Sequence, residues 1–262
     1  MLGFAIKKAF FDLWDNLFFA LVVNLVYTLA TLGLAWLTFW LAQLVAGTSP
    51  AGVIAFWPVP FLGAAVLGGA ASFWARDIAV GGTARFSDIF ARLGESWKAS
   101  LVFAAAWLIV GLGLYFGVGF YTSINAILGF VFGVIMMWGA FFLAGLGLFY
   151  PGLNAQVEPK IDKLFRKAVL IFVANPLTSL VMAVVFLVSV ALSVFTLGFF
   201  PGIVGVSLWL QVCFKFVLAK YEWIEANPEA DRKHVPWRTI LQEDMEKIGP
   251  RSLKNLIFPW KD

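Results

Sequence analysis

The side chains that could do chemistry within this chain are uncharged amides set in long apolar stretches. Asn24, Gln43, Asn125 and Gln211 all fall in runs of residues that contain no Asp, Glu, Lys or Arg. Amides donate and accept hydrogen bonds without carrying charge, so a set of them could line a path for a neutral, sugar-like solute. They could equally hydrogen-bond neighbouring helices to one another, as polar residues in membrane proteins often do. We favour bonding between helices and keep the polar path as the alternative.

The residues of nucleophilic, acid–base and metal chemistry are too few to form a site. His234 is the only histidine and Cys213 the only cysteine, so the sequence predicts neither a metal site nor an intrachain disulfide. The apolar stretches hold no acid or base for a Ser/His/Asp set or for intramembrane proteolysis. No GxxxxGK[ST] loop is present to bind ATP. We therefore expect no catalytic residue and no cofactor.

A second set of candidate residues is apolar and suits contact with a protein or a membrane surface. In the segment Arg85–Lys98 the apolar side chains recur at helical spacing beside charged ones. Such a helix is expected to lie in the membrane interface with its rings toward the lipid. The ending Arg251–Asp262 again combines apolar and basic residues, and suits the membrane surface or a partner protein. The candidate contact residues are Phe86, Ile89, Phe90, Leu93 and Trp97, with Phe258 and Trp260.

Both sets of residues must be positioned by helices that cross a membrane. The chain is 61% hydrophobic and 13% charged, with a mean hydropathy of +0.89, whereas a soluble domain is about 25% charged. Residues 16–75, 99–157 and 168–214 contain no charge, and each run can hold two spans of about 20 residues with a turn between them. The sequence therefore predicts an all-α membrane protein with six spans. They lie near residues 18–46, 53–75, 99–120, 125–149, 169–196 and 200–219.

The charges predict the orientation of these spans. All 19 basic and all 15 acidic residues fall in the segments on one side of the predicted spans, and the three opposite turns carry none. By the positive-inside rule this side is cytoplasmic, and we expect both termini there. The net charge of +4 is explained by this topology, so we expect a lipid bilayer and no nucleic acid as a partner.

The chain divides into a transmembrane domain, residues 1–223, and a polar cytoplasmic tail, residues 224–262, in which we expect a short helix over Pro236–Ile248. A short amphipathic segment precedes each pair of spans, namely Lys7–Asn16, Arg85–Lys98 and Lys160–Lys167, and we expect short helices there. Such segments arise next to any membrane, so a threefold repeat is one interpretation and coincidence the other. Small residues at four-residue spacing, such as Gly113 and Gly117, favour packed hairpins or a homo-oligomer interface.

Three segments resemble the YesL-like family of uncharacterised bacterial integral membrane proteins. They are Pro58–Phe103, Tyr150–Leu180 and Pro201–Trp223, and the resemblance extends over most of residues 15–223. It implies a location in the bacterial cytoplasmic (inner) membrane and a role beside carbohydrate ABC import systems. It assigns no catalytic residue.

Three hypotheses for the function follow. The leading one is a non-enzymatic accessory subunit that packs against the permease subunits of a carbohydrate-type ABC transporter, an identity that comes from the resemblance alone. The second is a stand-alone channel or facilitator for a neutral solute, lined by the four amides. The third is a structural protein that organises lipid.

Overall fold

The computed structural model describes residues 1–46, 56–157, 160–229, 231 and 235–251, and every regular element within them is a helix. Six helical segments are long and apolar enough to cross a membrane, which confirms the predicted fold class. Residues 53–55, at the start of the predicted second span, lie outside the described ranges. The first two spans are α2 (Leu17–Ala46) and α4 (Pro58–Gly81). The third is one continuous segment made of α5 (Asp88–Leu112), η1 (Gly113–Gly117) and α6 (Val118–Ile124). The last three are α7 (Ala126–Gln156), α9 (Pro176–Phe195) and α10 (Gly202–Ala226).

The predicted amphipathic segments take two different forms. Two of them are separate helices, α1 (Leu2–Asp15) and α8 (Ile161–Ala174). The third, Arg85–Lys98, is no separate interfacial helix: α5 begins at Asp88 and continues into the third span without a break. Its sequence contains no proline that would end the helix before the apolar part begins.

The fifth span and the tail also differ from the predicted boundaries. α9 begins at Pro176 instead of residue 169, because proline starts a helix readily but cannot continue one, and the residues before it belong to α8. The single tail helix predicted over Pro236–Ile248 is two short helices, α11 (Trp237–Ile240) and α12 (Gln242–Ile248).

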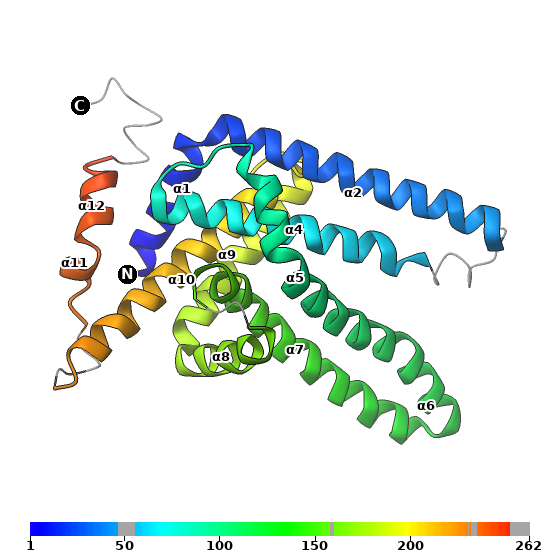
Figure 1. Cartoon of the computed structure of the whole chain (residues 1–262). Coiled ribbons are helices and arrows are strands. Elements are labelled where there is room, and N and C mark those ends of the chain that lie inside the picture. Colours follow the sequence, from blue (N-terminus) through cyan, green and yellow to red (C-terminus); the bar gives the residue numbers. More distant parts are fainter. Residues whose placement is uncertain (47–55, 158–159, 230, 232–234, 252–262) are drawn as a thin grey trace.

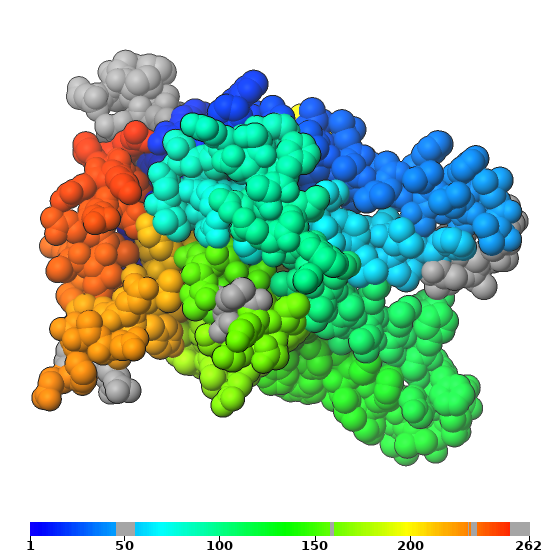
Figure 2. All heavy atoms as spheres, viewed as in Figure 1, coloured from blue at the N-terminus to red at the C-terminus, as the bar shows by residue number. Residues whose placement is uncertain are grey.

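α10 is the central helix of the molecule. It packs against α1, α2, α4, α7 and α9, and nearly all its side chains from Gly202 to Val217 are buried. The other spans leave many large apolar side chains exposed, which suits contact with lipid. Figure 1 shows α2 with α4, and α5 and α6 with α7, as two arms that extend away from this centre. In the space-filling view the outer ends of the arms stand apart (Figure 2).

Small residues allow close packing within the second arm. A side chain at Gly117 would meet the ring of Phe132, and one at Gly129 would meet the backbone of Thr122. Within this chain the four-residue spacing of small residues therefore serves a packed hairpin, the first of the two roles considered for it.

Asn24 of α2 holds the turn between α9 and α10. Its Nδ2 donates hydrogen bonds to the carbonyl oxygens of Phe199 and Pro201, both at 2.9 Å, and its Oδ1 accepts one from the amide of Val204 at 3.0 Å. Asn24 lies about 10 Å from the start of α2 and about 33 Å from its end, at 1.5 Å per residue. The α9–α10 turn is therefore beside the first third of α2, far short of that helix's outer end. Gly198, which packs against Thr28, lies at the same level.

Ion pairs fix the middle of α10 to α1 and α12, the helices at the two ends of the described chain. The Asp244 carboxylate of α12 forms ion pairs with the ammonium groups of Lys215 of α10, at 2.8 Å, and of Lys8 of α1, at 3.2 Å. Lys8 also pairs with Asp12 at 2.8 Å. Lys8, Asp12 and Asp244 are buried, and Leu241 packs beside them in the core. We call the part of the molecule formed by α1, the Arg76–Lys98 segment, α8 and the described residues between Lys215 and Arg251 the charged face.

Replacement of Asn24 by alanine is expected to destabilise the fold. Asn24→Ala leaves two carbonyls and one amide of the α9–α10 turn without a partner, at a cost of about 2 kcal/mol of unfolding free energy. Thermal unfolding in detergent measures this loss. Gln43→Ala is the control, because Gln43 is a half-buried amide near the other end of the same helix. Equal melting temperatures for the two variants would contradict the role assigned to Asn24.

The buried ion pairs predict a pH dependence. Burial raises the pKa of Asp12 above its ordinary value of 3.8, although Lys8 and Lys215 act against this and Asp244 adds to it. Protonation of Asp12 therefore favours the folded state as the pH falls from neutral toward 3.8. As the pH is lowered from 7.5 to 5, the melting temperature of the wild type should rise relative to that of Asp12→Asn. A relative fall over this interval would show that the pKa is lowered instead.

Candidate functional site: an apolar cavity with a charged entrance

A large cavity in the described part of the chain lies among five spans and has a volume of about 950 Å³. Its walls come from α4, α5, α7, α9 and α10, with the end of α8, and they are almost entirely apolar. One face of α7 supplies Ala144, Gly145, Leu148 and Pro151, which follow helical spacing. A cavity of this size and character is within the range of sites that bind small apolar molecules.

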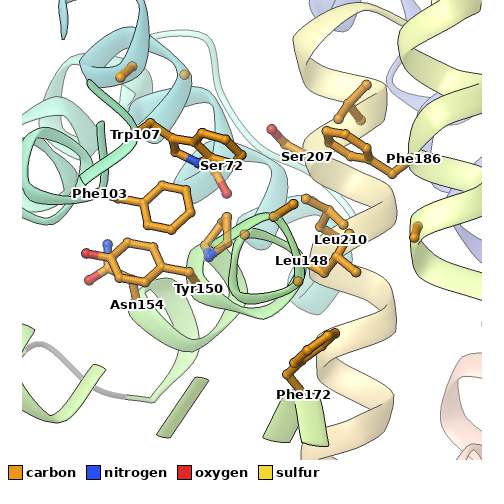
Figure 3. Close-up of a pocket in the computed structure, with 18 of the residues that line it drawn as sticks. Ser72, Phe103, Trp107, Leu148, Tyr150, Asn154, Phe172, Phe186, Ser207 and Leu210 are labelled. Atoms are coloured by element: carbon orange, nitrogen blue, oxygen red, sulfur yellow. The ribbon is translucent and has the colours of Figure 1, made fainter. Parts of the chain in front are cut away.

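Aromatic rings form one wall of the cavity. The rings of Phe103 and Tyr150 are stacked with centroids 4.5 Å apart, and the Tyr150 hydroxyl donates a hydrogen bond to the Ala99 carbonyl at 2.8 Å. Figure 3 shows these two rings beside Asn154, with Phe186 and Leu210 across the cavity. The wall is therefore held in place by stacking and by one interhelical hydrogen bond.

A network around Gln211 lies beside the cavity and ties three helices together. Gln211 of α10 donates from Nε2 to the Ser72 hydroxyl of α4 at 2.9 Å and to the Pro151 carbonyl of α7 at 3.2 Å. Its Oε1 accepts a hydrogen bond from Gln156 Nε2 at 2.7 Å. Ser72 lines the cavity, and its hydroxyl already accepts a hydrogen bond within the protein. The network thus leaves the cavity wall with little polar character.

A second, smaller pocket of about 460 Å³ adjoins the cavity on the charged face. Arg76, Glu95 and Lys98 line it, and Phe73 and Asn154 line both pockets. Arg76 is the first charged residue after the apolar part of α4, and Lys98 is the last one before the apolar part of α5. Together the two pockets form a space that is lined by charged residues at one end and by apolar residues at the other.

The structure does not bring the four predicted amides together. Asn24 and Gln211 are buried and make hydrogen bonds between helices, as the favoured interpretation proposed. Asn125 is exposed at the turn between α6 and α7, where its side chain caps α7 by accepting a hydrogen bond from the amide of Ile127 at 2.8 Å. Gln43 lies near the outer end of α2. None of the four lines the large cavity.

The predicted contact residues on α5 and its preceding turn are divided between the core and the surface. Phe86 and Ile89 pack against the core, and Leu93 is half-buried. Phe90 is 71% exposed and Trp97 42% exposed. Phe258 and Trp260 lie outside the described residues, as does His234.

Sequence reasoning missed the cavity and its charged entrance. The cavity depends on how five helices meet, and a single sequence gives no helix pairing. One signal was present: the small residues Gly69, Gly145 and Gly147 line the cavity and leave room for side chains of α5 and α8 to pack against α4 and α7.

No family model, no curated protein and no solved structure matches this chain. Its function is therefore inferred from its own residues and their arrangement.

Proposed function

We propose that this protein is a non-enzymatic membrane protein that holds a lipid acyl chain within its transmembrane bundle and so organises lipid around itself. The observation that supports this proposal is the apolar cavity of about 950 Å³ among α4, α5, α7, α9 and α10. Its walls offer dispersion contacts and few free hydrogen-bonding groups, which suits a hydrocarbon chain and disfavours a sugar or an ion.

The contacts of the polar residues agree with this proposal. A path for a neutral solute needs amides that face a common space. Asn24 and Gln211 instead bond to other helices, and Asn125 caps α7 at the opposite end of the second arm. We therefore place lipid binding ahead of solute conduction.

Filling the cavity should abolish lipid retention. Ala144→Trp places an indole in the cavity from α7, and we expect this variant to lose most of the bound lipid. The purified, delipidated protein is incubated with an equal mixture of phosphatidylcholine and phosphatidylglycerol, and native mass spectrometry counts all the retained lipid. Ala105→Trp is the control, because Ala105 is exposed on α5 and does not line the cavity. Absence of retained lipid on the wild type, or equal retention by both variants, would overturn the proposal.

A second candidate function is that of an accessory subunit of a carbohydrate-type ABC importer. It is supported by the exposure of Phe90, at 71%, near the start of α5. The carbohydrate transporter as the partner comes only from the proposed resemblance to the YesL-like family. Trp97 lies two turns further along the same helix and is 42% exposed. Large exposed aromatic residues are frequent anchors of protein–protein interfaces.

Loss of these aromatic side chains should weaken that complex. Gentle detergent purification of the natively expressed protein is expected to recover ABC permease subunits in stoichiometric amounts. Phe90→Ala with Trp97→Ala should reduce their recovery, whereas Phe195→Ala, which removes an 87% exposed ring from α9, should not. A wild-type protein recovered as a homo-oligomer alone would exclude the accessory role.

A further inference from the structure

We propose that the lipid is an anionic phospholipid, whose headgroup binds at Lys98 and Arg76 while an acyl chain occupies the large cavity. This inference rests on the proposed lipid binding and adds the class of headgroup and the place where it binds. Its basis is the continuity of a charged pocket with an apolar one.

The two pockets are arranged as the two parts of a phospholipid are. The smaller pocket lies on the charged face. Phe73 and Asn154 line both this pocket and the apolar cavity, and so lie where the two meet. Ser72 precedes Arg76 by about one helical turn and lines the apolar cavity. A ligand with a charged end and a hydrocarbon chain therefore fits both pockets at once.

The charges around the smaller pocket leave one cation in excess among the described residues. Asp77 pairs with Arg76 at 2.7 Å and with Arg92 at 2.8 Å, and Glu95 pairs with Arg92 at 2.7 Å. Three cations thus face two carboxylates. Lys98 is the cation left over, and it is exposed at the rim.

Lys98 is available to bind an anion. The contact that its ammonium group makes within the described chain is with the ring of the neighbouring Trp97, whose centroid is 5.5 Å away. An exposed contact of this kind is weak and leaves the three N–H donors free. A phosphate group brought to this position would gain a charge-assisted hydrogen bond.

Arg76 and Asn154 supply the fixed part of the site. Arg76 donates to the Ala155 carbonyl at 2.8 Å, and its guanidinium lies 5.3 Å from the centroid of the Phe73 ring, so its position is set by α4 and α7 together. The side-chain amide of Asn154 forms no hydrogen bond within the described chain and lies at the junction of the pockets. There it is suited to the ester carbonyl that joins headgroup and chain in a phospholipid.

A zwitterionic lipid and a free anion each use only part of this arrangement. The choline of a zwitterionic headgroup would bring a second cation to Lys98. A free phosphate would leave the apolar cavity without a role. An anionic phospholipid makes use of both pockets.

Competition between two lipids tests the inference. The purified protein is exchanged into mixed micelles with equal amounts of phosphatidylglycerol and phosphatidylcholine of identical acyl chains, and native mass spectrometry counts each bound lipid. We expect the wild type to prefer phosphatidylglycerol. Lys98→Gln should lower that preference about fivefold, the effect of one basic residue near an anionic lipid.

Lys163→Gln is the matched control. Lys163 is an exposed lysine on the neighbouring helix α8, and its replacement changes the net charge equally without touching either pocket. Equal binding of the two lipids by the wild type, or an equal loss of preference in both variants, would overturn the headgroup site and leave the proposed lipid binding intact. Retention of neither lipid by the wild type would overturn both proposals.

Discussion

The structure depends on the requirement that a polar group surrounded by apolar side chains must find a partner within the protein. α10 meets this requirement at three levels. At its start, the carbonyls and amide of the α9–α10 turn bond to Asn24 of α2. Near its middle, Gln211 bonds to α4 and α7, and one turn further along Lys215 pairs with Asp244. An unpartnered polar group in such surroundings costs several kcal/mol, so these contacts strongly favour one arrangement of the helices around α10.

The architecture around α10 also explains the cavity. The helices are held together at the charged face, whereas the two arms diverge beyond it (Figure 1). Gly69, Gly145 and Gly147 allow side chains of α5 and α8 to pack closely against α4 and α7 along the walls of the cavity. An apolar space among the spans, with a charged pocket beside it, is the result. The same packing that stabilises the bundle therefore creates the proposed site.

Much of the fold could be predicted from the sequence because hydropathy and charge report it directly. The three uncharged runs predict six spans, and turn residues place the ends beside the three uncharged turns within about five positions. At the charged face α4, α7 and α10 continue six or seven residues past their predicted ends. The other differences are at Pro176, where α9 begins, and between Lys98 and Ala99, where no break separates the amphipathic part of α5 from the apolar part. The candidate site could not be predicted in the same way. Gln211 and Asn24 were identified as polar residues within spans, but their partners are as many as 180 positions away in the chain.

The position of α10 in the chain has a consequence for how the protein is made. The helix that completes the core is the last span to leave the ribosome, so the five earlier spans enter the membrane before their common partner exists. Until then Asn24, Ser72 and Gln156 lack the groups that they bond in the finished protein. The earlier spans can pack against one another, as α4 does against α5, but the packing around α10 forms only late in synthesis. A chain cut short before residue 202 would lack the helix against which α1, α2, α4, α7 and α9 pack.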